Sequence, residues 1–456
     1  MTHTASKADS SAILKKGRYY ILDDYAGRDD TYGKVVHSIL ESIQEIEGRE
    51  CREKVESAGL SRLHKYFPVE KVLLLENLLL KRLRNDLYYW TFRVGKEDLG
   101  LRSTFFVDHL IMIRIHYPFL VARRAKTVLP PPFPFSEKLK LGIAACKNWR
   151  FLFNLFDRVK RNKLARWQSR YDPETYHRRL PAPARSHGPH IDTWYGHSYS
   201  GMNLWWSIDG VNEDNTVILY PDLFGRPVTY DPTSMYVKSG IPLTKPHKIK
   251  LEPGQLLLFN PEILHSTQVN ISDSTRIAIG TRLNPNKPYF DKDAPFHFEH
   301  WHSSDDLEQR RFSSIRLFSA KQHSGAPPVV EQSLTRTDPT VRIRCPERLT
   351  LDEPVAVCRS TDLRDGDKLA VDLGNVKVLL YRGEEMLRAL SRICPHLGID
   401  LMDGYHDNEK IYCPGHGVAY SFENGSSRCE AFSLRRYEAF ERDGMIYLRL
   451  GKNKSS

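Results

Sequence analysis

The sequence has no apolar run long enough to cross a membrane: no segment of its 456 residues approaches the roughly 18 uninterrupted apolar residues that a spanning helix needs. Residues 1–7 lead into a polar stretch with no apolar run behind it, so we expect no signal peptide. Cysteine is scarce, and most of the seven residues are scattered without the rhythm of a disulfide framework. These absences predict a cytoplasmic protein.

The sequence also lacks nucleic-acid-binding motifs, although it is basic. It carries 67 Lys and Arg against 56 Asp and Glu, a formal net charge of +11 that is spread thinly along the chain. A basic surplus favours acidic partners, but without a motif we expect no nucleic-acid partner. A polar or anionic small molecule is the better expectation for a substrate, while a merely solvated basic surface would have the same composition.

A chain of this length has room for two or three domains. Apolar residues recur at helical spacing over 32–55 and again after Pro68, whereas short apolar runs bounded by turn residues predict strands from about residue 186 onward. The predicted organisation is a disordered tail over 1–30, a first domain over 31–302 with a helical part at 31–180 and a strand-rich core at 186–290, a polar linker over 303–340, and a second domain over 341–456.

Two short segments near the C-terminus each pair a cysteine with a histidine: Cys394-Pro395-His396 and Cys413-Pro414-Gly415-His416. Two thiolates and two imidazoles are the ligand set of a Rieske [2Fe–2S] centre, in which the cysteines hold one iron and the histidines the other. Zinc accepts the same residue types, but its usual spacing places Cys with Cys and His with His. The mixed pairs therefore favour a [2Fe–2S] cluster held by Cys394, His396, Cys413 and His416.

The residues around these pairs resemble the Rieske ferredoxin domain over roughly 340–452. The resemblance rests on Leu397-Gly398, Ile411-Tyr412, Gly417 and the run 443–448. It implies a small all-β domain that moves single electrons. Ile399 and Gly415 stand where Rieske proteins of respiratory complexes carry extra cysteines, which implies a ferredoxin or oxygenase-component type with a potential at the low end of the family range.

A second set of metal ligands lies in the strand-rich part, where His190-Ile191-Asp192 is followed later by His265. Alternating residues of an extended segment point the same way, so His190 and Asp192 can bind one ion. Two imidazoles and one carboxylate form the facial triad of non-haem Fe(II) oxygenases, which leaves coordination positions open. A chelating 2-oxoacid can take two open positions, and O₂ can take a third.

The surroundings of His265 resemble the phytanoyl-CoA dioxygenase family of 2-oxoglutarate oxygenases. The resemblance is carried by the stretch 251–259, His265-Ser266-Thr267, Asn270, Ser272 and Arg276. It covers roughly residues 100–290 and implies a double-stranded β-helix, a jelly roll of the cupin kind, with Fe(II) and 2-oxoglutarate. Arg276 follows His265 by eleven residues, as in the family, which implies a guanidinium that binds the distal carboxylate of 2-oxoglutarate. Asn203 and Thr267 are further candidates for binding 2-oxoglutarate.

Two features narrow the chemistry that this resemblance implies. Halogenases of the superfamily replace the carboxylate of the triad with a small residue, so the presence of Asp192 points to hydroxylation, desaturation or ring closure. The segments Asn215-Thr216 and Tyr220-Pro221-Asp222 depart from the family's pattern. An acyl-CoA substrate is therefore not carried over to this chain.

Other histidines are weaker candidates for metal ligands. His187 and His197 flank the triad and are expected beside the ligands, not among them. His297 and His302 have the spacing of the two histidines in the Rieske non-haem oxygenases, with His300 between them. In those proteins the Rieske domain comes first, and here the order is reversed, so this trio is a minor alternative.

The combined prediction is a mainly β protein with N-terminal helices, in which a double-stranded β-helix oxygenase domain precedes a small all-β Rieske domain. We expect an Fe(II)- and 2-oxoglutarate-dependent dioxygenase that acts with O₂ on a polar or anionic small molecule, and whose Rieske domain passes electrons to the mononuclear iron. A ferredoxin or reductase is the expected electron donor, and assembly into a homo-oligomer stays open. Two alternatives remain: a Rieske-dependent monooxygenase that does not use 2-oxoglutarate, and a non-enzymatic redox or oxygen sensor.

Overall fold

The computed structural model describes residues 3–5, 9, 12–14, 17–23, 30–124, 186–231, 235–291, 298–319, 324–325, 340–343, 353–384, 386–396 and 398–451. Residues 125–185 lie outside this description, and with them a large share of the helical part predicted over 31–180. Among the described residues, no helix combines the length and the apolar character needed to cross a bilayer.

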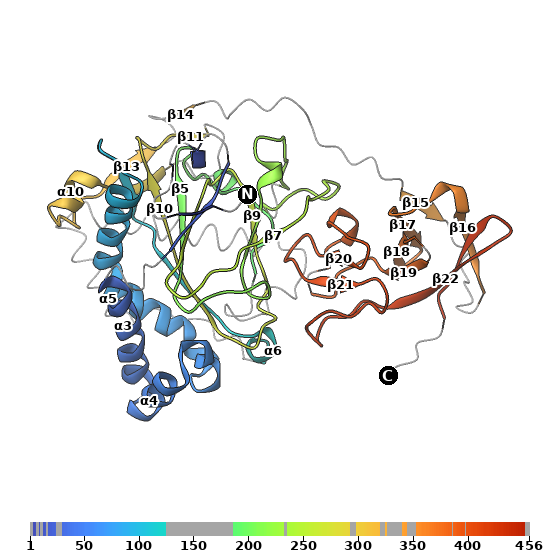
Figure 1. Ribbon diagram of the computed structural model, residues 1–456, viewed down its shortest axis with the longest axis horizontal. Coiled ribbons are helices and arrows are strands. Elements are labelled where there is room, and N and C mark those ends of the chain that lie inside the picture. The colour runs from blue at the N-terminus through green and yellow to red at the C-terminus, as the bar shows by residue number, and fades with distance from the viewer. Residues whose placement is uncertain are drawn as a thin grey trace, which may run out of the picture.

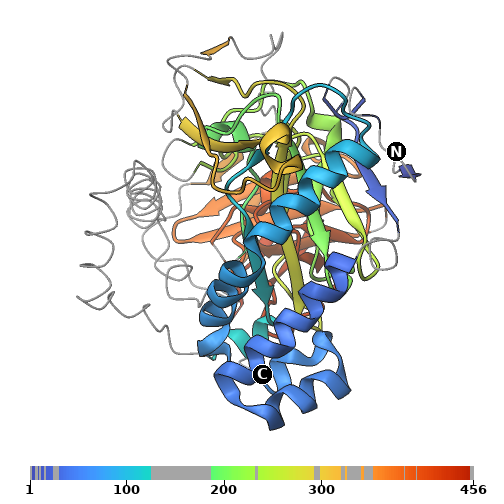
Figure 2. The ribbon, with the colours of Figure 1, turned by 90° about the vertical axis from the view of Figure 1, so that its left-hand side faces the viewer.

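The N-terminal helices cover one side of the strand-rich core (Figures 1 and 2). This layer consists of α3 (Asp30–Glu47), α4 (Arg49–Ala58) and α5 (Val72–Arg93), and the short helices α6 (Phe119–Ala122) and α10 (Ser304–Glu308) follow later in the chain. The single helix predicted over 32–55 is two helices, because Gly48 between them has a φ of 88°, outside the right-handed helical region. In α5, Leu75, Leu79 and Leu83 recur every four residues and are buried toward the core.

The larger of the first domain's sheets has nine strands in the order β1-β2-β8-β5-β10-β3-β12-β13, with β4 also paired to β10. Apart from the parallel pair β1–β2, its neighbours are antiparallel. The strands are β1 (His3–Ala5), β2 (Tyr20–Leu22), β3 (Phe106–Asp108), β4 (Met112–His116), β5 (Met202–Ser207), β8 (Leu256–Phe259), β10 (Arg276–Asn284), β12 (Phe298–Ser303) and β13 (Arg316–Ser319).

A smaller antiparallel sheet, in the order β7-β6-β9, complements the larger one. Its strands are β6 (Val217–Tyr220), β7 (His247–Lys248) and β9 (Leu264–Thr267). Two further short strands, β11 (Phe290–Asp291) and β14 (Ser324–Gly325), pair in parallel. A cavity lies between strands of the two sheets, with β4, β5 and β10 contributing from one and β6 and β9 from the other.

Two segments that were predicted to lack structure contribute strands to the larger sheet. Within the tail predicted over 1–30, Tyr20–Leu22 forms β2, which pairs with β8 and is buried. Within the linker predicted over 303–340, α10 follows β12, and β13 pairs with β12. The physical reason is burial of aromatic and apolar side chains: Phe318 of β13, for example, packs edge-on against Phe106 at 5.0 Å.

The C-terminal part is a separate β structure, as Figure 1 shows. Seven strands form a sheet in the order β15-β17-β18-β19-β22-β23-β16, and contact between β15 and β16 nearly closes it into a barrel. The strands are β15 (Thr340–Ile343), β16 (Val355–Arg359), β17 (Lys368–Leu373), β18 (Val376–Arg382), β19 (Leu387–Ser391), β22 (Arg436–Arg442) and β23 (Met445–Arg449). A hairpin of β20 (Lys410–Tyr412) and β21 (Ala419–Ser421) extends from it toward the first domain.

Candidate metal centres

The structure brings His190, Asp192 and His265 together at one end of the cavity. A backbone bridge joins the two histidines, with His190 N donating to His265 O at 2.9 Å and His265 N donating to His190 O at 3.0 Å. Oδ1 of Asp192 lies 3.5 Å from Nε2 of His190 and 3.6 Å from Nε2 of His265. All three residues are buried, and their ligand atoms lie within 4.8 Å of one another.

The other ring nitrogens of the histidines prepare this site for a metal. Nδ1 of His190 lies 2.8 Å from the carbonyl oxygen of Gly188, and Nδ1 of His265 lies 2.9 Å from that of Ile263. A carbonyl only accepts, so each Nδ1 carries the proton and each Nε2 is free to bind a cation. Burial, followed by repulsion from His190, lowers the pKa of His265 to about 4, so the imidazole is neutral at pH 7.

The carboxylate of Asp192 is held ionised by its neighbours. Asn203 Nδ2 donates to its Oδ2 at 2.8 Å, and Arg282 Nε approaches the same oxygen at 3.4 Å. Burial by itself disfavours the charge, but the positive charge of Arg282 and the proximity of His265 hold the pKa of Asp192 well below its ordinary value. Two imidazoles and one carboxylate fit the facial triad of a non-haem Fe(II) site.

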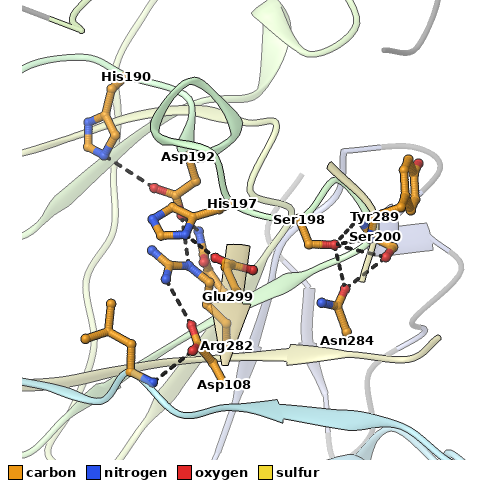
Figure 3. Close-up of polar contacts among 12 residues, drawn as sticks. Asp108, His190, Asp192, His197, Ser198, Ser200, Arg282, Asn284, Tyr289 and Glu299 are labelled. Carbon is orange, nitrogen blue, oxygen red and sulfur yellow. Dashed lines mark hydrogen bonds and ion pairs between the residues drawn. The ribbon is translucent and has the colours of Figure 1, made fainter. Parts of the chain in front are cut away.

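A row of buried charges supports the ligand Asp192 (Figure 3). Arg282 bridges from Asp192 to Asp108, whose Oδ2 lies 3.1 Å from Arg282 Nη1. Beside them, Nδ1 of His197 lies 2.5 Å from Oε1 of Glu299. With an acid at each end, the guanidinium of Arg282 has little freedom to move, and the orientation of Asp192 is therefore restrained.

The loop after the ligand is held by a second polar group, also visible in Figure 3. The hydroxyls of Ser198 and Ser200 donate to Oδ1 of Asn284 at 3.3 and 2.9 Å. Oγ of Ser198 also accepts from the backbone N–H of Tyr289 at 3.1 Å. These bonds tie the segment that follows Asp192 to the end of β10.

The triad opens into a cavity of about 350 Å³ that also contains Arg276. Nη1 of Arg276 donates to the backbone oxygens of Asn215 at 2.6 Å and Thr216 at 3.4 Å, while its buried Nε has no hydrogen-bond partner among the described residues. Within the described part of the chain, no carboxylate lies at ion-pair distance from it. Burial, followed by repulsion from Arg114, lowers the pKa of Arg276 to about 9, so the guanidinium remains charged at pH 7.

Arg114 is a cavity residue that the sequence analysis did not identify. It lies on β4 opposite Ala278 of β10, which is two residues from Arg276 and four residues from Arg282 along that strand. Its side chain lines the cavity and contacts Met112 Sδ at 3.2 Å. The signal available in the sequence was an arginine within the apolar run 110–117, although nothing there indicated that β4 borders the triad.

The remaining candidates from the sequence are distributed around the same cavity. Asn203 and Thr267 both line it, and the amide N–H of Asn203 is used by Asp192. His187, His197 and His300 line it as well. Of the minor alternative trio, His297 lies outside the described residues, and His302 contacts His109 at 3.1 Å. Among the described residues, the triad and one other set of side chains lie close enough together to hold a metal ion, and neither set includes a member of this trio.

That other set is formed by Cys394, Cys413 and His416 in the C-terminal domain. Sγ of Cys394 lies 3.1 Å from Nε2 of His416 and 3.3 Å from the hydroxyl of Tyr420. The ring of His396 lies 4.5 Å from that of His416, and all four predicted cluster ligands are 0–1% exposed. Burial disfavours the thiolate form of Cys394. Hydrogen bonding with Cys413 and the nearby His416 nevertheless hold the pKa of Cys394 well below its usual value.

The two ligand-bearing loops have the same backbone pattern. Gly398 N donates to Cys394 O at 2.8 Å, and Gly417 N donates to Cys413 O at 2.9 Å. Both glycines have positive φ, 67° and 70°, which side-chain-bearing residues rarely adopt. The matching turns present one cysteine and one histidine each, the arrangement that a Rieske cluster requires.

The C-terminal domain docks on the first domain close to these loops. Gly240 N donates to Oδ2 of Asp403 at 2.9 Å, and Leu243 N donates to the carbonyl oxygen of Asp403 at 2.8 Å. Arg428 forms an ion pair with Asp214 at 2.6 Å. Apolar packing continues across the boundary, because one core cluster includes residues of both domains.

Comparison with known proteins assigns the C-terminal domain. The family description "Rieske [2Fe-2S] domain" matches residues 353–436. The chain is 33% identical over 101 residues to human apoptosis-inducing factor 3, covering 21% of this chain and 16% of that protein. It is 35% identical over 74 residues to the ferredoxin component of the alkene monooxygenase system of Xanthobacter autotrophicus, covering 16% of this chain and 61% of that protein. It is 30% identical over 102 residues to the cholesterol 7-desaturase nvd of Bombyx mori, covering 20% of this chain and 22% of that protein.

Among solved structures, a complex of reduced oxygenase and oxidised ferredoxin in carbazole 1,9a-dioxygenase matches with 25% identity and a TM-score of 0.21, covering 22% of this chain and 95% of the matched one. The chain spans less than two thirds of the length of the curated relatives named above. The family match and the ligand geometry confirm the predicted Rieske [2Fe–2S] domain and disfavour zinc. The family match does not extend to the domain that carries His190, Asp192 and His265.

Proposed function

We propose that this chain, which joins a Rieske [2Fe–2S] domain to a buried His–Asp–His site, is an Fe(II)- and 2-oxoglutarate-dependent dioxygenase. In this proposal it hydroxylates, desaturates or cyclises a polar or anionic small molecule, and electrons pass from its Rieske domain to the mononuclear iron. The observation that carries the proposal is the shared cavity of the triad and Arg276. A candidate metal site meets there with a buried guanidinium that has no acidic partner among the residues the structure describes.

The triad supplies what a mononuclear Fe(II) needs from the protein. Nε2 of His190, Nε2 of His265 and Oδ1 of Asp192 converge, and each ligand is oriented by a hydrogen bond on its other side. Fe(II) held in this way would couple decarboxylation of 2-oxoglutarate by O₂, which yields succinate and CO₂, to oxidation of the substrate. The surrounding strands exclude bulk water from the ligands, which are each less than 9% exposed.

Arg276 is the proposed anchor for 2-oxoglutarate. Backbone carbonyls hold one side of its guanidinium, and the rest of the group faces the cavity that the triad shares. A guanidinium binds a carboxylate through two parallel hydrogen bonds, and burial strengthens that attraction. Thr267 and Asn203 border the same space and complete the proposed co-substrate site. The two facing antiparallel sheets around this cavity support a double-stranded β-helix for the domain.

Arg114 favours an anionic substrate. It is a second guanidinium in the cavity, and its side chain has no ion pair within the described residues; Glu76 is the acid with the largest electrostatic influence on it. Arg282, in contrast, is already paired with Asp108 and Asp192. Once the distal carboxylate of 2-oxoglutarate occupies Arg276, Arg114 remains as a positive group for a carboxylate, sulfate or phosphate of the substrate.

The Rieske domain is the proposed source of single electrons for the mononuclear site. A [2Fe–2S] cluster held by Cys394, His396, Cys413 and His416 stores and releases one electron at a time. We assign it the task of restoring Fe(II) after an uncoupled turnover, and we expect a cytoplasmic ferredoxin or reductase as the donor. The docking of the Rieske domain beside β6 and β9, the latter carrying His265, supports this assignment.

The experiment that tests the proposal is metal and product analysis of protein purified without oxygen. We expect about three irons and two sulfides per chain, with a Rieske EPR signal after dithionite reduction. Addition of 2-oxoglutarate and O₂ should then release succinate. Zinc at the triad of active protein, or an absence of succinate from iron-loaded protein, would contradict the oxygenase assignment.

The electron role has its own test. Cys394→Ser should remove the Rieske signal and make succinate release decline over successive turnovers when ascorbate is withheld. Added ascorbate should restore the rate, because it replaces the lost source of electrons. An unchanged turnover number without ascorbate would remove the electron role while leaving the dioxygenase assignment intact.

A Rieske-dependent monooxygenase that does not use 2-oxoglutarate is the second candidate. It is favoured by the names of two relatives, a cholesterol 7-desaturase and the ferredoxin component of an alkene monooxygenase system. In that case an external donor and O₂ would support substrate oxidation without 2-oxoglutarate. Arg276 would then have no co-substrate to bind. Arg276→Gln therefore separates the two candidates, because it should impair substrate oxidation only if the reaction uses 2-oxoglutarate.

A further inference from the structure

Strand β9 has different chemistry on its two faces. His265 and Thr267 line the metal cavity, and because side chains alternate along a strand, Ser266 points to the opposite face. Ser266 pairs with Ile218 of β6, and both residues are 0% exposed. Gln268 comes directly after the strand, two residues beyond Ser266 and three beyond the ligand His265.

The loop that carries Cys413 and His416 lies against this outer face. A Cβ atom placed on Gly417 would lie 2.2 Å from Cδ1 of Ile218 and 2.6 Å from Oε1 of Gln268. The backbone of the cluster loop therefore touches both side chains directly. Gln268 thus lies between the loop that holds the cluster ligands and the strand that holds a ligand of the triad.

The side-chain amide of Gln268 is buried without a hydrogen-bond partner in the described part of the chain. The residue is 0% exposed, and its backbone N–H donates to Thr216 O at 2.8 Å. Neither Oε1 nor Nε2 has a partner. Buried amides are normally hydrogen-bonded, because removing them from water without compensation is unfavourable. The sulfurs of an occupied cluster site are acceptors of the kind that this amide lacks.

A second contact near the cluster ligands cannot supply such a bond. Phe119 of α6 packs edge-on against the ring of His396, with centroids 5.1 Å apart. A phenyl ring encloses the site but donates no hydrogen bond. Among the described residues, Gln268 therefore combines an amide donor that suits the cluster with incomplete hydrogen bonding at this interface.

We propose that Gln268 is a positioning residue that joins the two metal sites within one chain. Its amide donates a hydrogen bond to the occupied Rieske site, and its strand leads to His265. Hydrogen bonds to cluster sulfurs favour the reduced state and raise the reduction potential. A further consequence rests on the proposed function: one electron passes along this contact from the Rieske site to a ferric ion at the triad, which becomes ferrous, and a reduced ferredoxin or reductase replaces that electron.

The test is an EPR-monitored redox titration of the full chain with its cluster loaded. Gln268→Leu removes the amide, and we expect a more negative midpoint potential, by about 59 mV for each tenfold loss in preference for the reduced state. The g-values of the reduced signal should also change, while the iron and sulfide content stays the same. Gln309→Leu, at an exposed glutamine of the first domain, is the matched control and should leave both quantities unchanged.

A second variant keeps the test decisive if Gln268→Leu does not fold. Gln268→Glu preserves the shape of the side chain but replaces the donating NH₂ with an oxygen, so the potential should again become more negative. A wild-type potential and signal in a folded Gln268 variant would overturn the inference. The titration needs neither 2-oxoglutarate nor iron at the triad, so a failure of the proposed dioxygenase activity would not be mistaken for a failure of this inference.

Discussion

At the scale of single residues, hydrogen bonds orient each side chain of the triad His190, Asp192 and His265. The Nδ1 atoms of His190 and His265 are occupied by backbone carbonyls, which leaves Nε2 for a metal. Oδ1 of Asp192 lies near both Nε2 atoms, and Oδ2 of Asp192 accepts hydrogen bonds from Asn203 and Arg282. These hydrogen bonds restrain all three side chains in an arrangement that suits a metal ion.

Replacement of Asp192 should therefore empty this site alone. Asp192→Asn keeps the shape of the side chain but removes the negative charge that binds a divalent cation and pairs with Arg282. We expect the iron content to fall from about three to about two per chain, with sulfide and the Rieske EPR signal unchanged. Asp222→Asn, at an exposed acid, serves as the control. Loss of sulfide together with iron would mean that the variant disturbs the whole chain.

Replacement of Arg276 should weaken the binding of 2-oxoglutarate. Arg276→Gln removes a charged pair of hydrogen bonds to the distal carboxylate, so the KM for 2-oxoglutarate in succinate release should rise on the order of 10- to 100-fold. The exposed Arg226→Gln is the control. An unchanged KM would show that another group anchors the co-substrate.

At the scale of elements, α5 and β4 meet through one buried acid. Oε1 of Glu76 accepts from the backbone N–H of Ile115 at 2.7 Å, and burial raises the pKa of Glu76 to about 7. The positive charge of Arg114 acts in the opposite direction and limits this increase in the pKa of Glu76. The helix therefore contributes a titrating group to the wall behind the cavity.

Glu76 should make the folded state less stable as pH rises. Between its ordinary pKa of 4.5 and its folded pKa of about 7, the folded protein binds a proton that the unfolded chain does not, so stability falls with pH across this window. Glu76→Gln mimics the protonated form and should gain on the order of 1–3 kcal/mol relative to wild type at pH 8, with little gain at pH 5. Thermal unfolding at both values measures this, and an equal Tm difference at the two pH values would contradict it.

The periodic elements were also the part of the fold that the sequence predicted best. The helix after Pro68 and the strands around Trp206 and Phe259 formed as expected, because their apolar spacing matches one buried face. The single helix over 32–55 was wrong because Gly48 adopts a left-handed conformation. Strand β2 was missed because three apolar residues carry no period, and their burial depends on pairing with β8, which lies far away in sequence.

At the scale of the whole molecule, the two domains share an interface and part of a core. The core cluster runs from the N-terminal helices to the Rieske loops, and Asp403 receives hydrogen bonds from the segment 239–243. Lys248 lies 5.8 Å above the ring of Tyr412 at the same boundary. These contacts place the Rieske loops on the outer side of β6 and β9, with the triad on the inner side.

Weakening this interface should loosen the docking without unfolding either domain. Asp403→Ala removes an acceptor for Gly240 N and Ser239 Oγ, at a cost of about 1–3 kcal/mol for the unsatisfied donors. We expect faster hydrogen exchange over 239–243 and around Ile218, with the Rieske EPR signal retained. Asp365→Ala, at an exposed turn of the Rieske domain, is the control. Unaltered exchange at these segments would show that other contacts suffice for docking.

The sequence by itself determined the candidate ligands, because the residue types and the local spacing that a metal site requires occur within short segments of the chain. The four cluster ligands, the pair His190 and Asp192, and the pairing of His265 with Arg276 could all be recognised in this way. The tertiary structure alone decided which side chains meet across strands. Arg114, Glu76 and Gln268 acquire their surroundings from pairings over more than 30 residues, through β4 against β10, α5 against β4, and the Rieske loop against β9. Such pairings follow from the burial of whole elements, so no local pattern contains them.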